Sequence, residues 1–145
     1  MELTFGAILG IFSRWLHITS VVGLLGSFIY MRVAVWPALT SFGAGESPAL
    51  IEAMVTRFRG LLYTLLVTTL GSGLYNYLTK AAYPPHYHMV IGIKFLFVLH
   101  IFAVAILYAL PTSTPEKRKR WLSGMALSGL AIIAISAVLR WMTLH

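Results

Sequence analysis

The sequence predicts an all-α integral membrane protein, a single domain of four spans packed as an up-down-up-down four-helix bundle. Three observations predict this class. Hydrophobic residues make up 59% of the 145 residues and charged residues only 10%, whereas about 25% of an ordinary soluble domain is charged. Four apolar segments each approach the ~20 residues that cross a bilayer. Polar connectors with proline or glycine separate these segments.

The predicted spans cover residues 7–36, 61–78, 89–110 and 121–141. The first is longer than a bilayer requires, so we expect it to tilt, to project from the membrane or to begin as an interfacial helix, and Pro37 is expected to end it. Residues 51–58 form an amphipathic lead-in to the second span, in which Gly71-Ser72-Gly73 would let a neighbouring backbone approach closely.

Basic residues gather in the connectors that follow the first and third spans, which lie on one side of a four-span bundle. They are Arg32, Arg57, Arg59 and Lys117–Arg120, whereas the opposite connector contributes only Lys80. The positive-inside rule predicts that the basic side is cytoplasmic and that both termini lie outside the cytoplasm of a bacterial-type inner membrane. The net charge of +7 is then a topology signal and a lipid-headgroup anchor, with no role for nucleic acid.

Several classes of chemistry have no support in the sequence. There is no cysteine, which excludes disulfides, iron–sulfur clusters, thiolate metal sites and thioether-attached haem. No glycine-rich phosphate loop, Ser/His/Asp arrangement or HExxH motif is present. No paired carboxylates lie within the spans, which argues against a proton-coupled pump. Whether the protein is an enzyme is left open.

Two histidines lie inside predicted spans, His17 in the first and His100 in the third, at similar depth. These spans are diagonal in an up-down bundle, so their axes would be roughly 11–14 Å apart if neighbours are ~8–10 Å apart. Two imidazoles that bind one metal at ~2 Å each bridge such a distance. The pattern predicts a haem b ligated by His17 and His100. In the alternative, each imidazole donates to a helix carbonyl or a hydroxyl, without a cofactor.

Cations without acidic partners lie in the outer half of the spans, at Arg14, Lys94 and Arg140. Of the four carboxylates in the chain, only Glu2 could reach them. An unpaired cation at mid-depth costs ~2.5–3.5 kcal/mol, so we expect an anionic group nearby. Haem propionates, a quinone head group or an anionic lipid would serve. For Arg14 and Arg140, snorkelling to lipid phosphates is an alternative.

The outer connector offers a second candidate metal site at His86, His88 and Met89. Two imidazoles and a thioether suit copper, and the soft sulfur favours Cu(I). His145 and Met142 are expected on the same side of the membrane. Copper binding is therefore an alternative to haem.

Three motifs resemble the copper-resistance protein D (CopD)-like membrane domain. They are Arg57-Phe58, Thr69-Leu70-Gly71-Ser72-Gly73-Leu74-Tyr75, and Tyr87-His88-x4-Ile93-Lys94-Phe95-Leu96. The resemblance covers most of the chain from His17 onward. It implies a four-span bundle and a role in copper handling.

The opening motif Trp15-Leu16-His17-Ile18, followed by glycines and Arg32, is similar to the HemJ-type membrane protoporphyrinogen oxidase. That resemblance implies four spans, association with haem b, and functional positions at His17 and Lys94. The Tyr-His continuation usual in that family after Arg32 is absent here.

The favoured function is therefore that of a membrane-embedded b-type haem protein for electron transfer, with a quinone or another redox partner or as a subunit of a larger complex. His17 and His100 would ligate the haem, and Arg14 and Lys94 would neutralise its propionates. The alternatives are a copper-binding or copper-transport protein, and a cofactor-free structural subunit whose small-residue faces dock a homodimer or larger membrane complex.

Overall fold

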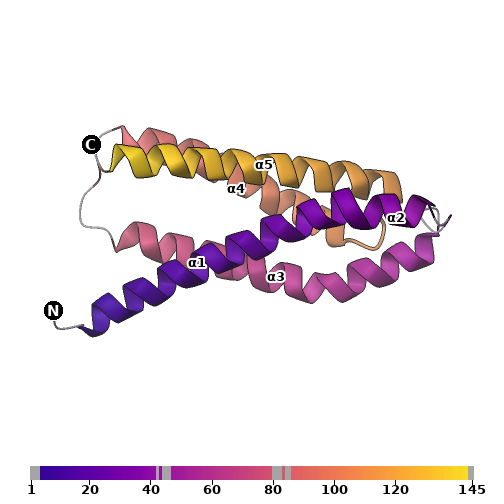
Figure 1. Cartoon of the computed structure of the whole chain (residues 1–145), viewed down its shortest axis with the longest axis horizontal. Coiled ribbons are helices and arrows are strands. Elements are labelled where there is room, and N and C mark those ends of the chain that lie inside the picture. The colour runs from indigo at the N-terminus through magenta and orange to yellow at the C-terminus, as the bar shows by residue number, and fades with distance from the viewer. Residues whose placement is uncertain (1–3, 42, 44–46, 80–82, 84–85, 144–145) are drawn as a thin grey trace.

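The computed structural model describes residues 4–41, 43, 47–79, 83 and 86–143. Throughout these residues the regular elements are helices, which confirms the all-α prediction. They are α1 (Phe5–Tyr30), the π-helical η1 (Met31–Val35), α2 (Trp36–Ser41), α3 (Pro48–Leu78), α4 (Tyr87–Ala109) and α5 (Pro115–Met142). Because α1, η1 and α2 run on as one rod from Phe5 to Ser41, the described chain forms four long helical rods (Figure 1).

The rods pack as two pairs, α1 with α3 and α4 with α5 (Figure 1). The α1 rod also packs on α5, whereas α3 and α4 meet over a smaller area, so that α1 and α4 are diagonal. The two pairs diverge toward the end where α1 begins and α5 ends (Figure 1). We call this end of the bundle the open end. A cavity lies there between α1, α3 and α4.

Three of the rods are long and apolar enough to cross a membrane: Phe5–Ser41, Tyr87–Ala109 and Pro115–Met142. The prediction of a membrane protein is confirmed to this extent. The fourth rod, α3, has 31 residues and is long enough, but it is less apolar, because Glu52, Arg57 and Arg59 lie in its first half and Thr69, Ser72 and Asn76 in its second. The four-span topology is therefore taken up below as a proposal.

The first rod does not end at Pro37, as the sequence predicted, but continues to Ser41. The reason lies in the π turn before it, where the Trp36 N–H donates to the Met31 carbonyl, one residue further back than in an α-helix. A proline ring collides with the carbonyl of the preceding turn in a regular α-helix. The wider turn gives the ring of Pro37 the room it needs. Likewise, the lead-in at 51–58 and the segment 61–78 are parts of one helix, α3.

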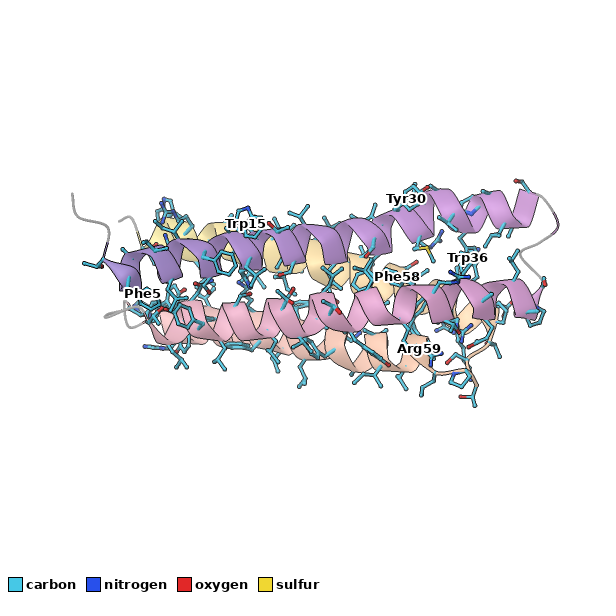
Figure 2. All side chains as sticks on the ribbon, turned by 90° about the horizontal axis from the view of Figure 1, so that it is seen from below. Phe5, Trp15, Tyr30, Trp36, Phe58 and Arg59 are labelled. Carbon is cyan, nitrogen blue, oxygen red and sulfur yellow. The ribbon has the colours of Figure 1, made fainter. Side chains whose placement is uncertain are left out.

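The hydrophobic core is concentrated in the half of the bundle that carries the basic residues, which we call the basic end. Its fully buried side chains come from all four rods: Phe28, Val55, Leu62, Tyr108, Leu122 and Met125. Trp36 and Phe58 lie between the first rod and α3 at this end, whereas Trp15 and Tyr30 lie on the outer surface (Figure 2). Exposed apolar side chains such as these are expected where the surface meets lipid.

Arg118 is one of four consecutive basic residues, and it is the one that holds the helices together at the basic end. Its side chain is only 2% exposed, and its Nη2 atom donates to Glu52 Oε2 and to the Leu110 carbonyl, both at 2.7 Å. Glu52 also lies 3.6 Å from Arg59. One buried cation therefore ties α5 to α3 and to the end of α4, and the basic end is held more firmly than the open end.

Candidate functional site between α1, α3 and α4

His17 is fixed against α3 by two contacts of its Nδ1 atom. The Thr69 carbonyl oxygen lies 3.0 Å away and Ser72 Oγ 3.1 Å away. The imidazole packs directly on the backbone of α3, where a Cβ atom on Gly73 would lie 2.9 Å from His17 Cε1. Only glycine at that position lets the imidazole occupy its place on α3.

These contacts decide which ring nitrogen of His17 carries the hydrogen. A carbonyl only accepts, so Nδ1 donates to Thr69. The Ser72 hydroxyl donates to the Thr68 carbonyl at 2.5 Å, which leaves its oxygen free to accept from Nδ1 as well. In the neutral imidazole the lone pair is then on Nε2. A histidine oriented through a backbone carbonyl in this way is the usual arrangement of a metal ligand.

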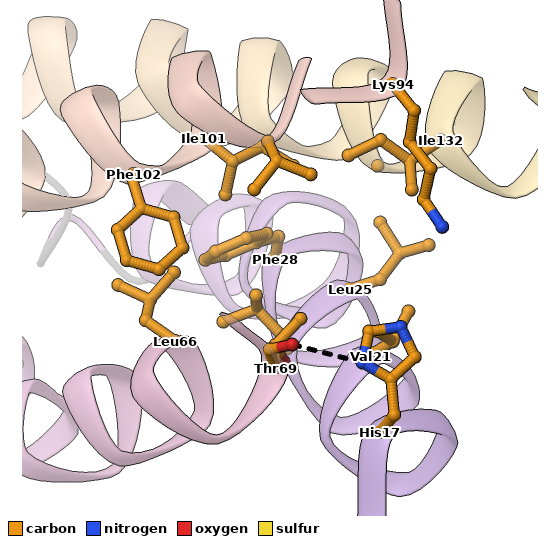
Figure 3. A pocket seen from close by; sticks show the side chains of 13 residues that line it. His17, Val21, Leu25, Phe28, Leu66, Thr69, Lys94, Ile101, Phe102 and Ile132 are labelled. Atoms are coloured by element: carbon orange, nitrogen blue, oxygen red, sulfur yellow. Dashed lines mark hydrogen bonds between the residues drawn. The ribbon is translucent and has the colours of Figure 1, made fainter. Parts of the chain in front are cut away.

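Lys94 lies opposite His17. Its side chain extends from α4 toward the imidazole, and both residues line one cavity (Figure 3). Among the described residues, Lys94 has no hydrogen-bond or ion-pair partner. A cation and a lone-pair donor therefore face the same space.

The inner part of this cavity is apolar and small, with a volume of about 60 Å³. All four rods contribute to its walls beyond His17 and Lys94: Val21, Leu24, Leu25, Phe28, Leu66, Thr69, Val98, Ile101, Phe102, Gly129 and Ile132 (Figure 3). This volume is below the ~300–1,000 Å³ of ligand pockets, and such walls exclude water.

The outer part of the cavity leads to the open end and is more polar. Its volume is about 250 Å³. His17, Thr69, Lys94 and Val98 line both parts, and Arg14 and Asn76 are added here. His17 and Lys94 therefore stand where the apolar and polar parts meet.

Three tyrosines line the outer part and stack on one another. The ring centroids of Tyr77 and Tyr83 are 5.2 Å apart, and those of Tyr83 and Tyr87 are 4.2 Å apart. Burial raises the pKa of Tyr83, with a further contribution from Tyr87 and Tyr77. The ring stack forms one wall of the mouth.

The structure brings together three of the predicted site residues, Arg14, His17 and Lys94. It does not bring His100 to them. The His100 side chain is exposed, its Nδ1 lies 2.9 Å from Ser128 Oγ, and it lines a separate groove between α4 and α5. The positions of the two imidazoles therefore do not favour one haem ligated by both.

The candidate copper residues lie around the first turn of α4. His86 and Met89 are exposed, and His88 Nδ1 lies 3.1 Å from the Tyr77 hydroxyl. Within the described ranges, no group of three or more His, Asp or Glu residues is arranged to hold a metal ion. His145 lies outside the described residues. Copper binding at this position stays a prediction.

Sequence reasoning missed the part that α3 plays in the site. It read the glycines as a place for a neighbouring backbone, but what approaches Gly73 is the imidazole of His17. The signal was a polar stripe on one helix face: Ser72 follows Thr69 by three residues, and Asn76 follows Ser72 by four. In an apolar helix such a stripe indicates a polar partner or cavity.

Compared with known proteins, the chain matches no family model, no curated protein and no solved structure. The resemblances to the CopD-like domain and to the HemJ-type oxidase are therefore neither supported nor refuted by these comparisons.

Proposed function

We propose that the protein binds a b-type haem in the cavity between α1, α3 and α4, that His17 Nε2 would hold it, and that it serves electron transfer within the membrane. The observation that carries this proposal is that the imidazole of His17 and the cation of Lys94 line one apolar cavity. The hydrogen bond from Nδ1 to the Thr69 carbonyl holds the ring in one orientation and leaves the lone pair of Nε2 for a ligand. A bound haem would supply a one-electron couple at its iron.

The donor set and the apolar character of the walls suit such a group, and the helices would have to part to admit it, because the inner part of the cavity has a volume of only about 60 Å³. The inner part is lined by aliphatic and aromatic side chains that suit an apolar macrocycle. Arg14 and Lys94 line the outer part, where they would pair with two propionates. Neither forms an ion pair with a described residue, so one ligand would account for both cations. The resemblance to the HemJ type, which implies roles for His17 and Lys94, points to the same pair of residues.

We also propose that α3 crosses the membrane as the fourth span. Two of its hydroxyls have partners that suit a lipid surrounding, because Thr64 and Ser72 donate to carbonyls one turn back and Ser72 also meets His17. The Thr69 hydroxyl is buried without a hydrogen-bond partner among the described residues. Backbone groups in a helix are satisfied internally, which a bilayer requires. With the basic end on the cytoplasmic side, both termini lie outside the cytoplasm.

A reduced-minus-oxidised spectrum of the protein, purified in detergent after haem-replete expression, tests the proposal. We expect Soret and α-bands in the wild type, their loss in His17→Ala and their retention in His100→Ala, which is a matched control on a different groove. A wild type without these bands would contradict haem binding. Loss of the bands in both variants would instead indicate that the two histidines share a haem.

Metal analysis of the same samples tests the copper alternative. Bound copper that is lost in His86→Ala/His88→Ala, without haem bands in the wild type, would favour a copper-binding protein. Absence of both haem and copper, with another chain that co-purifies, would favour the structural subunit.

A further inference from the structure

A groove on the outside of the bundle, between α4 and α5, gathers positive charge at the basic end. Its empty volume is about 760 Å³, including its open side, and it is lined by His100, Val104, Lys117, Arg120, Trp121 and Gly124. Lys117 and Arg120 are three residues apart on α5, so they project from the same face. Neither forms an ion pair with a described residue. The groove therefore presents two unpartnered cations side by side.

The four basic residues at the start of α5 differ in their surroundings. Arg118 is buried and bonded to Glu52, and Lys119 is exposed outside the groove. Only Lys117 and Arg120 line the hollow. Cations that served only as a topology signal would need no such hollow between them.

The floor of the groove depends on a glycine and a histidine. A Cβ atom on Gly124 would lie 3.7 Å from His100 Cε1, so a larger side chain there would fill the space. Ser128 holds His100 Nδ1 at 2.9 Å, which leaves Nε2 as the polar atom of that ring without a described partner. Lys117 and Gly124 are separated by roughly 10 Å along the helix axis. The groove therefore has the cations of Lys117 and Arg120 at one end and the imidazole of His100 at the other.

We propose that this groove binds the phosphate of an anionic glycerophospholipid at the basic face of the membrane. Lys117 and Arg120 would bind the phosphate. Trp121 would lie at the depth of the head groups, and His100 would face the glycerol ester region. Exposed leucines continue the surface of both helices beyond the groove, at Leu96, Leu99 and Leu127, where acyl chains would lie. A soluble anion would not contact this leucine surface.

Lipid binding is measured by native mass spectrometry of the detergent-purified full chain, titrated with phosphatidylglycerol and, for comparison, phosphatidylcholine. We expect the wild type to prefer phosphatidylglycerol. Lys117→Gln and Arg120→Gln should each lower that affinity roughly fivefold, the usual effect of one basic residue at an anionic surface. Lys119→Gln, with the same change of charge on the same turn, should lower it by less than about twofold.

The shape of the groove is tested separately by Gly124→Leu, with Gly60→Leu as its control, because a side chain at Gly60 meets nothing within 4 Å. Gly124→Leu should weaken phosphatidylglycerol binding with every charge intact, and Gly60→Leu should not. Equal losses in the Lys117 and Lys119 variants, or no preference in the wild type, would overturn the proposal. Competition by inorganic phosphate at the concentration of the lipid would also overturn it, because it would indicate a free-anion site.

Discussion

The Nδ1 atom of His17 lies 3.0 Å from the carbonyl oxygen of Thr69, 52 residues further along the chain. This contact joins α1 to α3 within an apolar bundle and leaves Nε2 for a ligand. It depends on the absence of a side chain at Gly73, where a Cβ atom would lie 2.9 Å from the imidazole. The orientation of His17 therefore depends on Gly73 as well as on its hydrogen bond to Thr69.

Gly73→Leu tests this dependence. The leucine side chain would displace the His17 ring from α3, so we expect the haem bands to be lost although every candidate ligand and cation is retained. Gly71→Leu is the matched control, because a side chain there meets nothing within 4 Å. The measurement is the absorbance ratio of haem to protein. Equal haem content in the two variants would contradict the role assigned to Gly73.

Lys94→Gln tests the electrostatic part of the site. A cation that pairs with a haem propionate stabilises the reduced, more negative haem, so its removal should lower the midpoint potential, by about 60 mV for each tenfold change in the relative stability of the two states. Potentiometric titration monitored at the α-band gives this value. Lys117→Gln, at the basic end, should leave the potential unchanged. A potential that Lys94→Gln does not lower would place Lys94 away from the bound group.

Glu52→Gln tests the buried cation at the basic end. Loss of the carboxylate leaves Arg118 buried without an opposing charge, a change that costs about 3–5 kcal/mol when the pair is fully enclosed. Because the Glu52 side chain is 34% exposed, we expect roughly 1–3 kcal/mol. Thermal unfolding in detergent measures the loss. Glu116→Gln, an exposed carboxylate on the first turn of α5, should change the midpoint little, and equal losses in both would argue against the role of this pair.

Single introduced cysteines test the four-span topology, because the chain has none of its own. If α3 crosses the membrane, Ser41→Cys and Thr79→Cys lie on opposite sides. A membrane-impermeant maleimide should then label Thr79→Cys in intact spheroplasts and Ser41→Cys only after permeabilisation. Labelling of both cysteines from the same side would show that α3 does not span the bilayer.

Much of the fold follows from local patterns in the sequence. The apolar segments predicted the helices of all four rods, because the length and hydropathy of a segment can be read from that segment alone. The end of the first rod at Pro37 was predicted wrongly, because the π turn from Met31 to Val35 accommodates the proline. No propensity of single residues indicates such a turn. Three residues that the sequence singled out, Arg14, His17 and Lys94, line one cavity, and their role in binding a cofactor stays a prediction.

The sequence by itself determined that the protein is helical, that it is apolar enough for a membrane, and which rare polar residues its helices carry. Only the tertiary structure decided which of them meet. The sequence predicted similar depths for His17 and His100, but His17 lies level with Lys94, which is six residues, roughly 9 Å, before His100 on α4. One imidazole packs on Gly73 of α3 and the other on Gly124 of α5. The offset between the helices along the bundle and the rotation of each helix about its own axis set this difference. That rotation is fixed by side-chain packing between rods distant in sequence, which a pattern within one segment does not contain.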